Sequence, residues 1–188
     1  MYNNVQVYAY TAYQFYAREG NVDLYLNKLK NLTEREYRNY QTARVKRGEL
    51  KATKTKEDIE AEVYRKHSGE INDIMAVERA VERMEKHKKS KLIMDILLYT
   101  VFADVLNIGP RLEVYKSTES IKAGTRVYEA MENLHISHAT VYYWLDYAYK
   151  LFAEERGLRY QEFPRLSRKY KKDKKKLTQG SKPIEEKE

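Results

Sequence analysis

The sequence predicts an all-α protein, with an N-terminal helical bundle, a C-terminal helix-turn-helix and a disordered basic tail. Three observations predict this class. Only 7 of the 188 residues are glycine and 3 are proline, and the chain is rich in the helix-favouring residues Lys, Glu, Leu and Ala. Apolar residues recur every three or four positions in several stretches, which is the helical period. Positive charge is concentrated near the C-terminus.

Composition excludes several classes of protein. The chain has no cysteine, which excludes disulfides, thiolate nucleophiles and sulfur-ligated zinc and fits a reducing cytosol. No stretch approaches the roughly 18 apolar residues of a membrane helix, and residues 1–16 lack the pattern of a secretory signal. We therefore expect a cytoplasmic protein with no membrane partner.

Residues 1–46 are predicted to form the N-terminal helices. The first helix covers about 5–18 and ends at Gly20. A second helix is expected to open near 31–36, where Thr33 and Glu36 have the spacing of a capping box, and to run toward Val45. Residues 47–56 have almost no apolar side chains, so they are predicted to be an exposed linker.

Residues 57–109 are predicted to form a helical bundle or oligomerisation segment. Thr55 and Asp58 can cap its first helix, which is interrupted at 67–69. The next helix carries a narrow apolar stripe at alternating steps of three and four, formed by Ile74, Val77, Val81 and Met84. Such a stripe packs on another helix, either of the same chain, which is the favoured interpretation, or of a second copy in a homo-oligomer.

A polar, basic break over 86–91 precedes the most apolar segment of the chain. Ser90 is placed to cap this segment, which carries apolar residues on most of its sides and is therefore predicted to be a central helix of the bundle. Gly109 and Pro110 are expected to end it.

Residues 111–163 are predicted to contain a helix-turn-helix. Its bracing helix places apolar residues on one face, a turn over 133–137 breaks that pattern, and Ser137 is placed to cap the helix that follows. The second helix has its apolar face at Val141, Leu145, Ala148, Leu151 and Phe152. Two such helices, joined by a tight turn, are the arrangement that inserts the start of the second helix into the major groove of DNA.

The sequence predicts double-stranded DNA as the partner. Residues 111–163 hold seven basic and eight acidic residues, whereas 165–176 in the flexible tail, 164–188, hold eight basic residues and one acidic residue. We expect the tail to follow phosphates without reading bases, although a merely solvated tail is an equal alternative. The predicted DNA-contacting residues are Lys122, Arg126, Ser137, His138, Ala139, Thr140, Tyr142, Tyr143, Lys150, Arg165, Arg168, Lys169, Lys171 and Lys172.

The segment Leu134-x-Ile136-Ser137-x-x-Thr140-Val141, followed by Leu145, Ala148 and Leu151, resembles the helix-turn-helix of sigma-factor region 4. In a small, helical, basic-tailed protein it is most similar to phage late-gene transcription regulators of the ArpU and RinA type. The resemblance covers about 40 residues, with His135 where the family usually has glycine and Met131 where it usually has alanine. It implies a phage activator that binds a promoter region and helps host RNA polymerase, and that is located in the cytoplasm of the bacterial host cell.

Two other functions remain open. A small terminase, which recognises DNA for packaging, would also combine a helix-turn-helix with helical oligomerisation segments. A helical interaction module would use the apolar stripe at 74–84 as its partner surface.

No catalytic site, cofactor or metal is expected. The chain has no glycine-rich phosphate loop, no HExxH motif and no nucleophile elbow, and His135 and His138 have no third ligand nearby. The aromatic residues around Trp144 can stack on single-stranded bases, but helical core filling is the favoured interpretation.

Overall fold

The computed structural model describes residues 4–48, 53–106 and 124–160. These residues form helices and connecting turns and contain no strand, which confirms the all-α prediction. The elements are α1 (Asn4–Glu19), α2 (Val22–Lys46), α3 (Lys56–Lys66), α4 (Ser68–Glu85), α5 (Ser90–Leu97), a π-helical segment η1 (Leu98–Phe102), α6 (Ala103–Leu106), α7 (Gly124–Leu134) and α8 (His138–Glu155). No helix in these ranges is long and apolar enough to cross a membrane.

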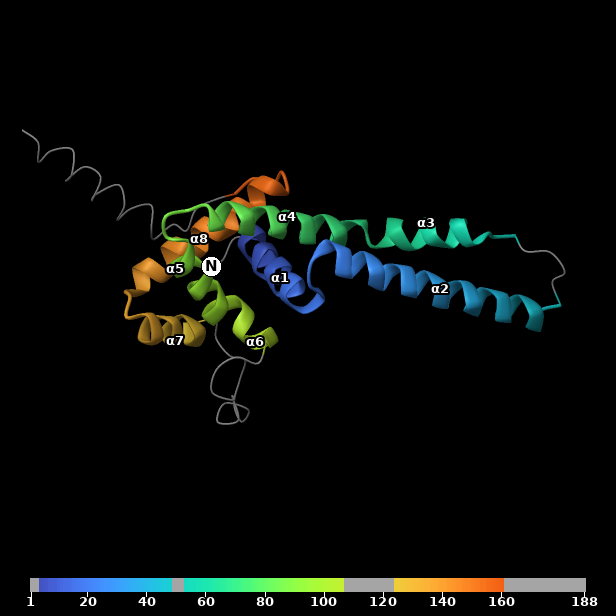
Figure 1. The fold of residues 1–188 in the computed structure, drawn as a ribbon, viewed down its shortest axis with the longest axis horizontal. Coiled ribbons are helices and arrows are strands. Elements are labelled where there is room, and N and C mark those ends of the chain that lie inside the picture. Colours follow the sequence, from blue (N-terminus) through green and yellow to red (C-terminus); the bar gives the residue numbers. More distant parts are fainter. Residues whose placement is uncertain (1–3, 49–52, 107–123, 161–188) are drawn as a thin grey trace, which may run out of the picture.

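Most of these helices pack around one core, which we call the body (Figure 1). Helices α1, α4, α5, α7, α8 and η1 each contribute buried apolar side chains to it. The predicted segments 57–109 and 111–163 therefore share a core, because α8 packs against both α4 and α5. The connection between them, residues 107–123, lies outside the described residues.

The apolar stripe of α4 is buried within the single chain, which confirms the favoured interpretation and not the alternative of a surface that packs on a second copy. Ile74, Val77 and Met84 are 0% exposed, and Val81 is partly buried against the body. Since their partners are helices of the same chain, these side chains offer no apolar surface to a second copy.

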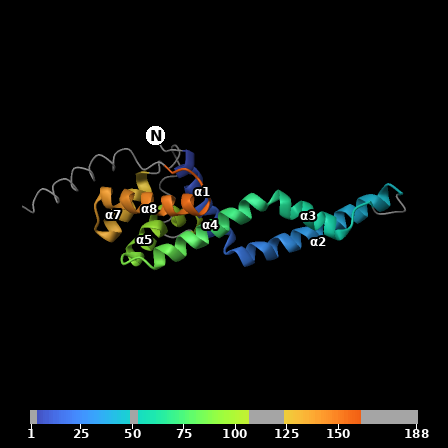
Figure 2. The ribbon, with the colours of Figure 1, turned by 90° about the horizontal axis from the view of Figure 1, so that it is seen from above.

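Helices α2 and α3 form an arm that projects from the body (Figure 2). Their contacts form a second cluster, with Tyr25 and Leu29 of α2 packed on Ile59 and Val63 of α3 and on the start of α4. The predicted cap of α3 is confirmed, because Thr55 and Asp58 form a complete capping box. Of the predicted linker, residues 47, 48 and 53–56 are exposed, and 49–52 lie outside the described residues.

Two predicted helix starts are wrong. Helix α2 begins about ten residues earlier than expected, with Asn21 as its N-cap, and Thr33 is buried in mid-helix, where its hydroxyl donates to the Leu29 carbonyl at 3.0 Å. Ser90 does not cap α5, because it is already the first helical residue and Lys89 occupies the N-cap position. The central position predicted for this segment is confirmed, since Ile93, Ile96 and Leu97 are fully buried.

Polar contacts fix α8 within the body. The Arg156 Nε donates to Asp73 Oδ1 of α4 at 2.6 Å, and the Arg156 Nη2 donates to the Tyr8 hydroxyl of α1 at 3.1 Å. The hydroxyl of Tyr13 donates to the Ala148 carbonyl at 3.0 Å, and complete burial raises the pKa of this tyrosine. Helix α8 is therefore tied to both α1 and α4.

Candidate nucleic-acid interface

A tight turn joins α7 to α8. His135 has φ 51°, a left-handed conformation that non-glycine residues seldom adopt. The next amide, Ile136 N, donates back to the Met131 carbonyl at 3.2 Å, as in a Schellman helix ending. Ser137 is the N-cap of α8, as predicted, and its hydroxyl accepts from Thr140 N at 3.2 Å. The turn is thus closed by hydrogen bonds on both sides.

The apolar faces of α7 and α8 point into the body, as their spacing predicted. Val127 and Ala130 of α7 are buried, and so are Val141, Leu145 and Phe152 of α8. Leu134 and Ile136 are partly buried against the same core. Since one face of α8 is held in the core, the opposite face of this helix points away from the core.

The residues predicted to contact DNA at the start of α8 divide into two groups. Ser137 and His138 are exposed, and Tyr143 is 36% exposed. In contrast, Ala139, Thr140 and Tyr142 are half-buried, with Tyr142 packed against the core. The accessible part of this helix end therefore consists mainly of Ser137, His138 and Tyr143.

Aromatic rings cover the side of this helix end that faces α7. The ring of His138 lies 4.6 Å from that of Tyr142 and 6.2 Å from that of Tyr128, measured between centroids. Tyr128 is 60% exposed and forms the outer edge of the group. These contacts place the His138 imidazole between the two helices at the surface.

Arg126 is a correction to the predicted DNA contacts. Its side chain is 6% exposed, and its Nη1 lies 2.8 Å from Glu129 Oε2 one turn later on α7. The residue lies beside Val127 and Ala130 on the inward face of that helix, so its charge is compensated inside the protein. It is not accessible to a phosphate.

Among the other predicted contacts, Lys150 is exposed on α8, about two turns beyond Tyr143. Lys122 and the tail residues lie outside the described residues; these tail residues are Arg165, Arg168, Lys169, Lys171 and Lys172.

The α4–α5 connection brings further basic residues to α8, and none of them is among the predicted DNA contacts. It carries three exposed lysines, Lys86, Lys88 and Lys89, and a fourth exposed lysine, Lys91, follows in the first turn of α5. His87, in their midst, packs its ring 5.2 Å from that of Trp144 and 5.5 Å from that of Tyr147, both on α8. The high density of lysines in this segment is visible in the sequence, but the position of these lysines beside α8 depends on the fold.

The aromatic residues of α8 serve mainly the core. Tyr149 is 5% exposed, and Tyr142, Trp144 and Tyr147 are partly buried against the body. This agrees with the favoured interpretation that they fill the edge of a helical core.

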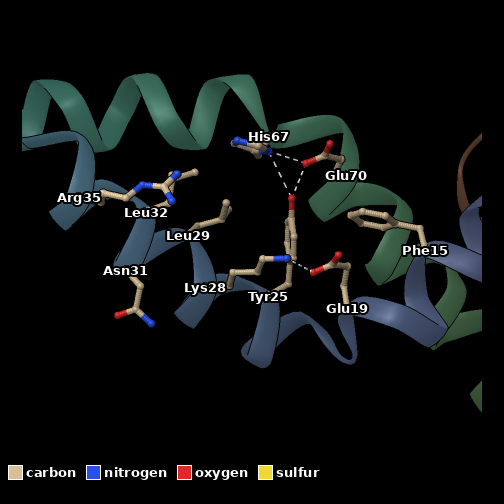
Figure 3. Close-up of a pocket in the computed structure, with 10 residues that line it drawn as sticks. All are labelled: Phe15, Glu19, Tyr25, Lys28, Leu29, Asn31, Leu32, Arg35, His67 and Glu70. Atoms are coloured by element: carbon tan, nitrogen blue, oxygen red, sulfur yellow. Dashed lines mark hydrogen bonds and ion pairs between the residues drawn. The ribbon is translucent and has the colours of Figure 1, made fainter. Parts of the chain in front are cut away.

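A separate hollow of ≈ 580 Å³ lies where the arm meets the body (Figure 3). Tyr25, His67 and Glu70 point toward one another in it, with the Tyr25 hydroxyl 3.3 Å from His67 Nδ1 and hydrogen-bonded to the Glu70 carboxylate. Burial, together with the hydrogen bond and charge of Glu70, raises the pKa of Tyr25. These contacts, together with the ion pair between Lys28 of α2 and Glu19 of α1, connect the arm to the body.

Within the described ranges, no group of three or more His, Asp or Glu side chains is arranged to hold a metal ion. Comparisons of the chain with family models, curated proteins and solved structures found no match.

Proposed function

We propose that the protein binds duplex DNA through α7 and α8 and acts as a sequence-specific transcription regulator. The observation that carries the proposal is the exposed, capped start of α8, which follows directly on a closed left-handed turn. The start of a helix carries a partial positive charge, and its first N–H groups have no partner within the helix, both of which favour a phosphate. In α8 the cap takes up Thr140 N and leaves the amides of His138 and Ala139, which precede it.

Rigid support of α8 adds to this argument. A recognition helix must hold a few side chains in a fixed register with base edges. Helix α8 is anchored at its far end by the ion pair between Arg156 and Asp73, and along its length by the buried residues Val141, Leu145 and Phe152. His138 and Tyr143 are therefore carried on a helix that is fixed from behind.

The side chains of His138 and Tyr143 suit base edges better than phosphates. An imidazole and a phenol can each exchange hydrogen bonds with a base edge and also offer an apolar face. Neither side chain carries a permanent positive charge, so we assign them to base contact and assign most of the phosphate attraction to lysines elsewhere.

The sequence resemblance extends the proposal to a regulator of phage late genes that activates transcription with host RNA polymerase. A reporter gene placed behind the bound promoter tests this step. Increased expression in the presence of the protein supports activation, and decreased expression indicates repression.

Selection of bound fragments from the source genome tests DNA recognition directly. We expect one short duplex to be enriched and to bind at least about 10³-fold more tightly than unrelated duplex at moderate salt. If no fragment is preferred under these conditions, the proposal is wrong.

A double variant, His138→Ala with Tyr143→Ala, tests which residues read the sequence. We expect it to lose most of the preference for the selected duplex while keeping its binding to unrelated duplex and its melting temperature. The control is Asn39→Ala with Thr42→Ala, two exposed positions on α2, which should leave the preference unchanged. A preference that survives in the double variant contradicts the assignment of these side chains.

A further inference from the structure

The connection between α4 and α5 concentrates positive charge on one exposed turn. Lys86, Lys88 and Lys89 of this turn and Lys91 in the first turn of α5 are all exposed, and none forms an ion pair with another residue of the described ranges. Glu82 and Glu85, in the last turn of α4, are the neighbouring acidic residues, and Arg83 is already paired with Glu154 and Glu155 of α8. The turn therefore keeps an excess of positive charge.

This turn is short, and its ends are anchored. Met84 before it and Ile93 after it are fully buried. Within it, His87 N donates to the Met84 carbonyl at 3.0 Å, and Ser90 N donates to the His87 carbonyl at 2.9 Å. The backbone that carries the lysines is consequently held to the body at both ends.

The His87 ring sets the position of the turn relative to α8. Its Nδ1 accepts a hydrogen bond from Lys89 N at 3.1 Å, and the ring packs on Trp144 and Tyr147. Trp144 lies six residues after His138, which corresponds to about 9 Å along a helix. The major groove is about 12 Å wide, so a group beside Trp144 is within a groove's width, along the helix, of the end that is proposed to enter the groove.

We propose that Lys86, Lys88, Lys89 and Lys91 form a phosphate clamp, which contacts the backbone of the same duplex that the start of α8 reads. This inference rests on the proposed function. It assigns the sequence-independent part of the binding to a structured turn of the body and not to the C-terminal tail alone.

A single strand is the less favoured ligand for this surface. Stacking on bases requires aromatic faces that are free, whereas Trp144 and Tyr147 are partly buried and already packed against His87 and the core. Lysines without an acid partner attract phosphates whatever the bases are.

The test is the salt dependence of binding by the full chain, measured by fluorescence anisotropy on two duplexes, one selected and one unrelated. The variant carries Lys86→Gln, Lys88→Gln and Lys89→Gln. Each lost phosphate contact reduces the slope of log K against log salt by about 0.9, so we expect a reduction of roughly 2 to 3. Affinity should fall by the same factor on both duplexes, which preserves their ratio.

A matched control removes the same charge from the arm. Lys30, Lys46 and Lys66 are exposed, and none has an ion pair with a described residue. Their replacement by Gln should change the slope by less than about 1, the value of one phosphate contact. Melting temperatures of both triple variants verify that the fold is kept.

The outcomes separate this inference from the proposed function. If the two triple variants reduce the slope equally, or the 86–89 variant leaves it unchanged, the clamp is refuted while sequence preference still supports the regulator. If the wild-type protein binds duplex without preference, the regulator fails, whereas a selective loss of slope in the 86–89 variant still identifies the turn as a phosphate contact. Binding of a single strand more tightly than either duplex, or absence of duplex binding, overturns both.

Discussion

Substitution of His135 tests whether the left-handed turn is a built-in constraint of the α7–α8 unit. At φ 51° a residue with a Cβ is destabilised by roughly 1–2 kcal/mol, and glycine is not. Glycine also makes the unfolded chain more flexible, which offsets about 0.4–1 kcal/mol of that gain. We therefore expect His135→Gly to be more stable than His135→Ala by about 0.5–1 kcal/mol.

Comparison of the two variants isolates the backbone effect, because both lack the imidazole. In a chain of this length the difference corresponds to about 1–4 °C in melting temperature, which differential scanning calorimetry resolves. The control is the same pair of substitutions at Lys150, an exposed position inside α8, where alanine should be more stable than glycine by about 1 kcal/mol.

A glycine variant at 135 that is less stable than the alanine variant would refute the assignment of a left-handed backbone there. The alternative would be a turn in which His135 takes an ordinary negative φ and the two helices meet at another angle. Since the start of α8 depends on this turn, the same result would weaken the case for a recognition helix.

Two further predictions concern the supports of this unit. Asp73→Asn removes the charge that Arg156 contacts at 2.6 Å, and the Asp73 side chain is only 14% exposed. We therefore expect this variant to lose about 1–3 kcal/mol of unfolding free energy in urea, whereas Glu154→Gln, in an exposed pair, should lose less than about 1 kcal/mol. Equal losses would contradict a special role for the partly buried pair. Burial of Glu70 raises the pKa of its carboxyl, but hydrogen bonds from the Tyr25 hydroxyl and the His67 imidazole outweigh this effect and lower that pKa. The stability that this carboxylate contributes is therefore present above pH 4.5 and is lost as the pH falls through the lower pKa of the folded state. The stability advantage of the wild type over Glu70→Gln should therefore shrink as the pH falls below 4.5 in thermal melts. An advantage that does not change with pH in acid would argue against a depressed pKa.

The helices with the clearest apolar period were predictable from sequence. The apolar residues of the α4 stripe and of the inward face of α8 recur at steps of three and four. Such spacing strongly indicates a helix with one buried face. Local capping chemistry was also reliable where it stood next to a polar loop, as at Thr55 and Ser137.

The spacing of a capping box predicted a helix start wrongly at a position where the helix continues. Thr33 and Glu36 have the spacing of a capping box, but Thr33 is buried and donates to a carbonyl of the preceding turn. Spacing alone does not distinguish a helix start from a helix interior, because the deciding factor is whether other elements pack on the preceding turn. Here Tyr25 and Leu29 pack on α3, which extends the helix back to Val22.

Accessibility could not be predicted from residue type. Arg126 is basic and belongs to the helix that braces the turn, yet it is buried and paired with Glu129. Conversely, the lysines of the α4–α5 connection resembled an ordinary solvated break until the packing of His87 on Trp144 placed them beside α8. Both results depend on contacts between residues that are close in space, and hydrophobic periodicity carries no information about which surface a charged residue reaches.

The sequence by itself determined the helical class, most helix faces and the turn before α8, because periodicity and capping act over a few neighbouring residues. Only the tertiary structure decided that α4 buries its apolar stripe within the chain, that α8 belongs to the same core as α1, and that a lysine-rich turn lies beside it. These features follow from which faces of distant helices meet, and many pairings of amphipathic helices satisfy the same local patterns. The full set of side-chain volumes and polar partners selects among them.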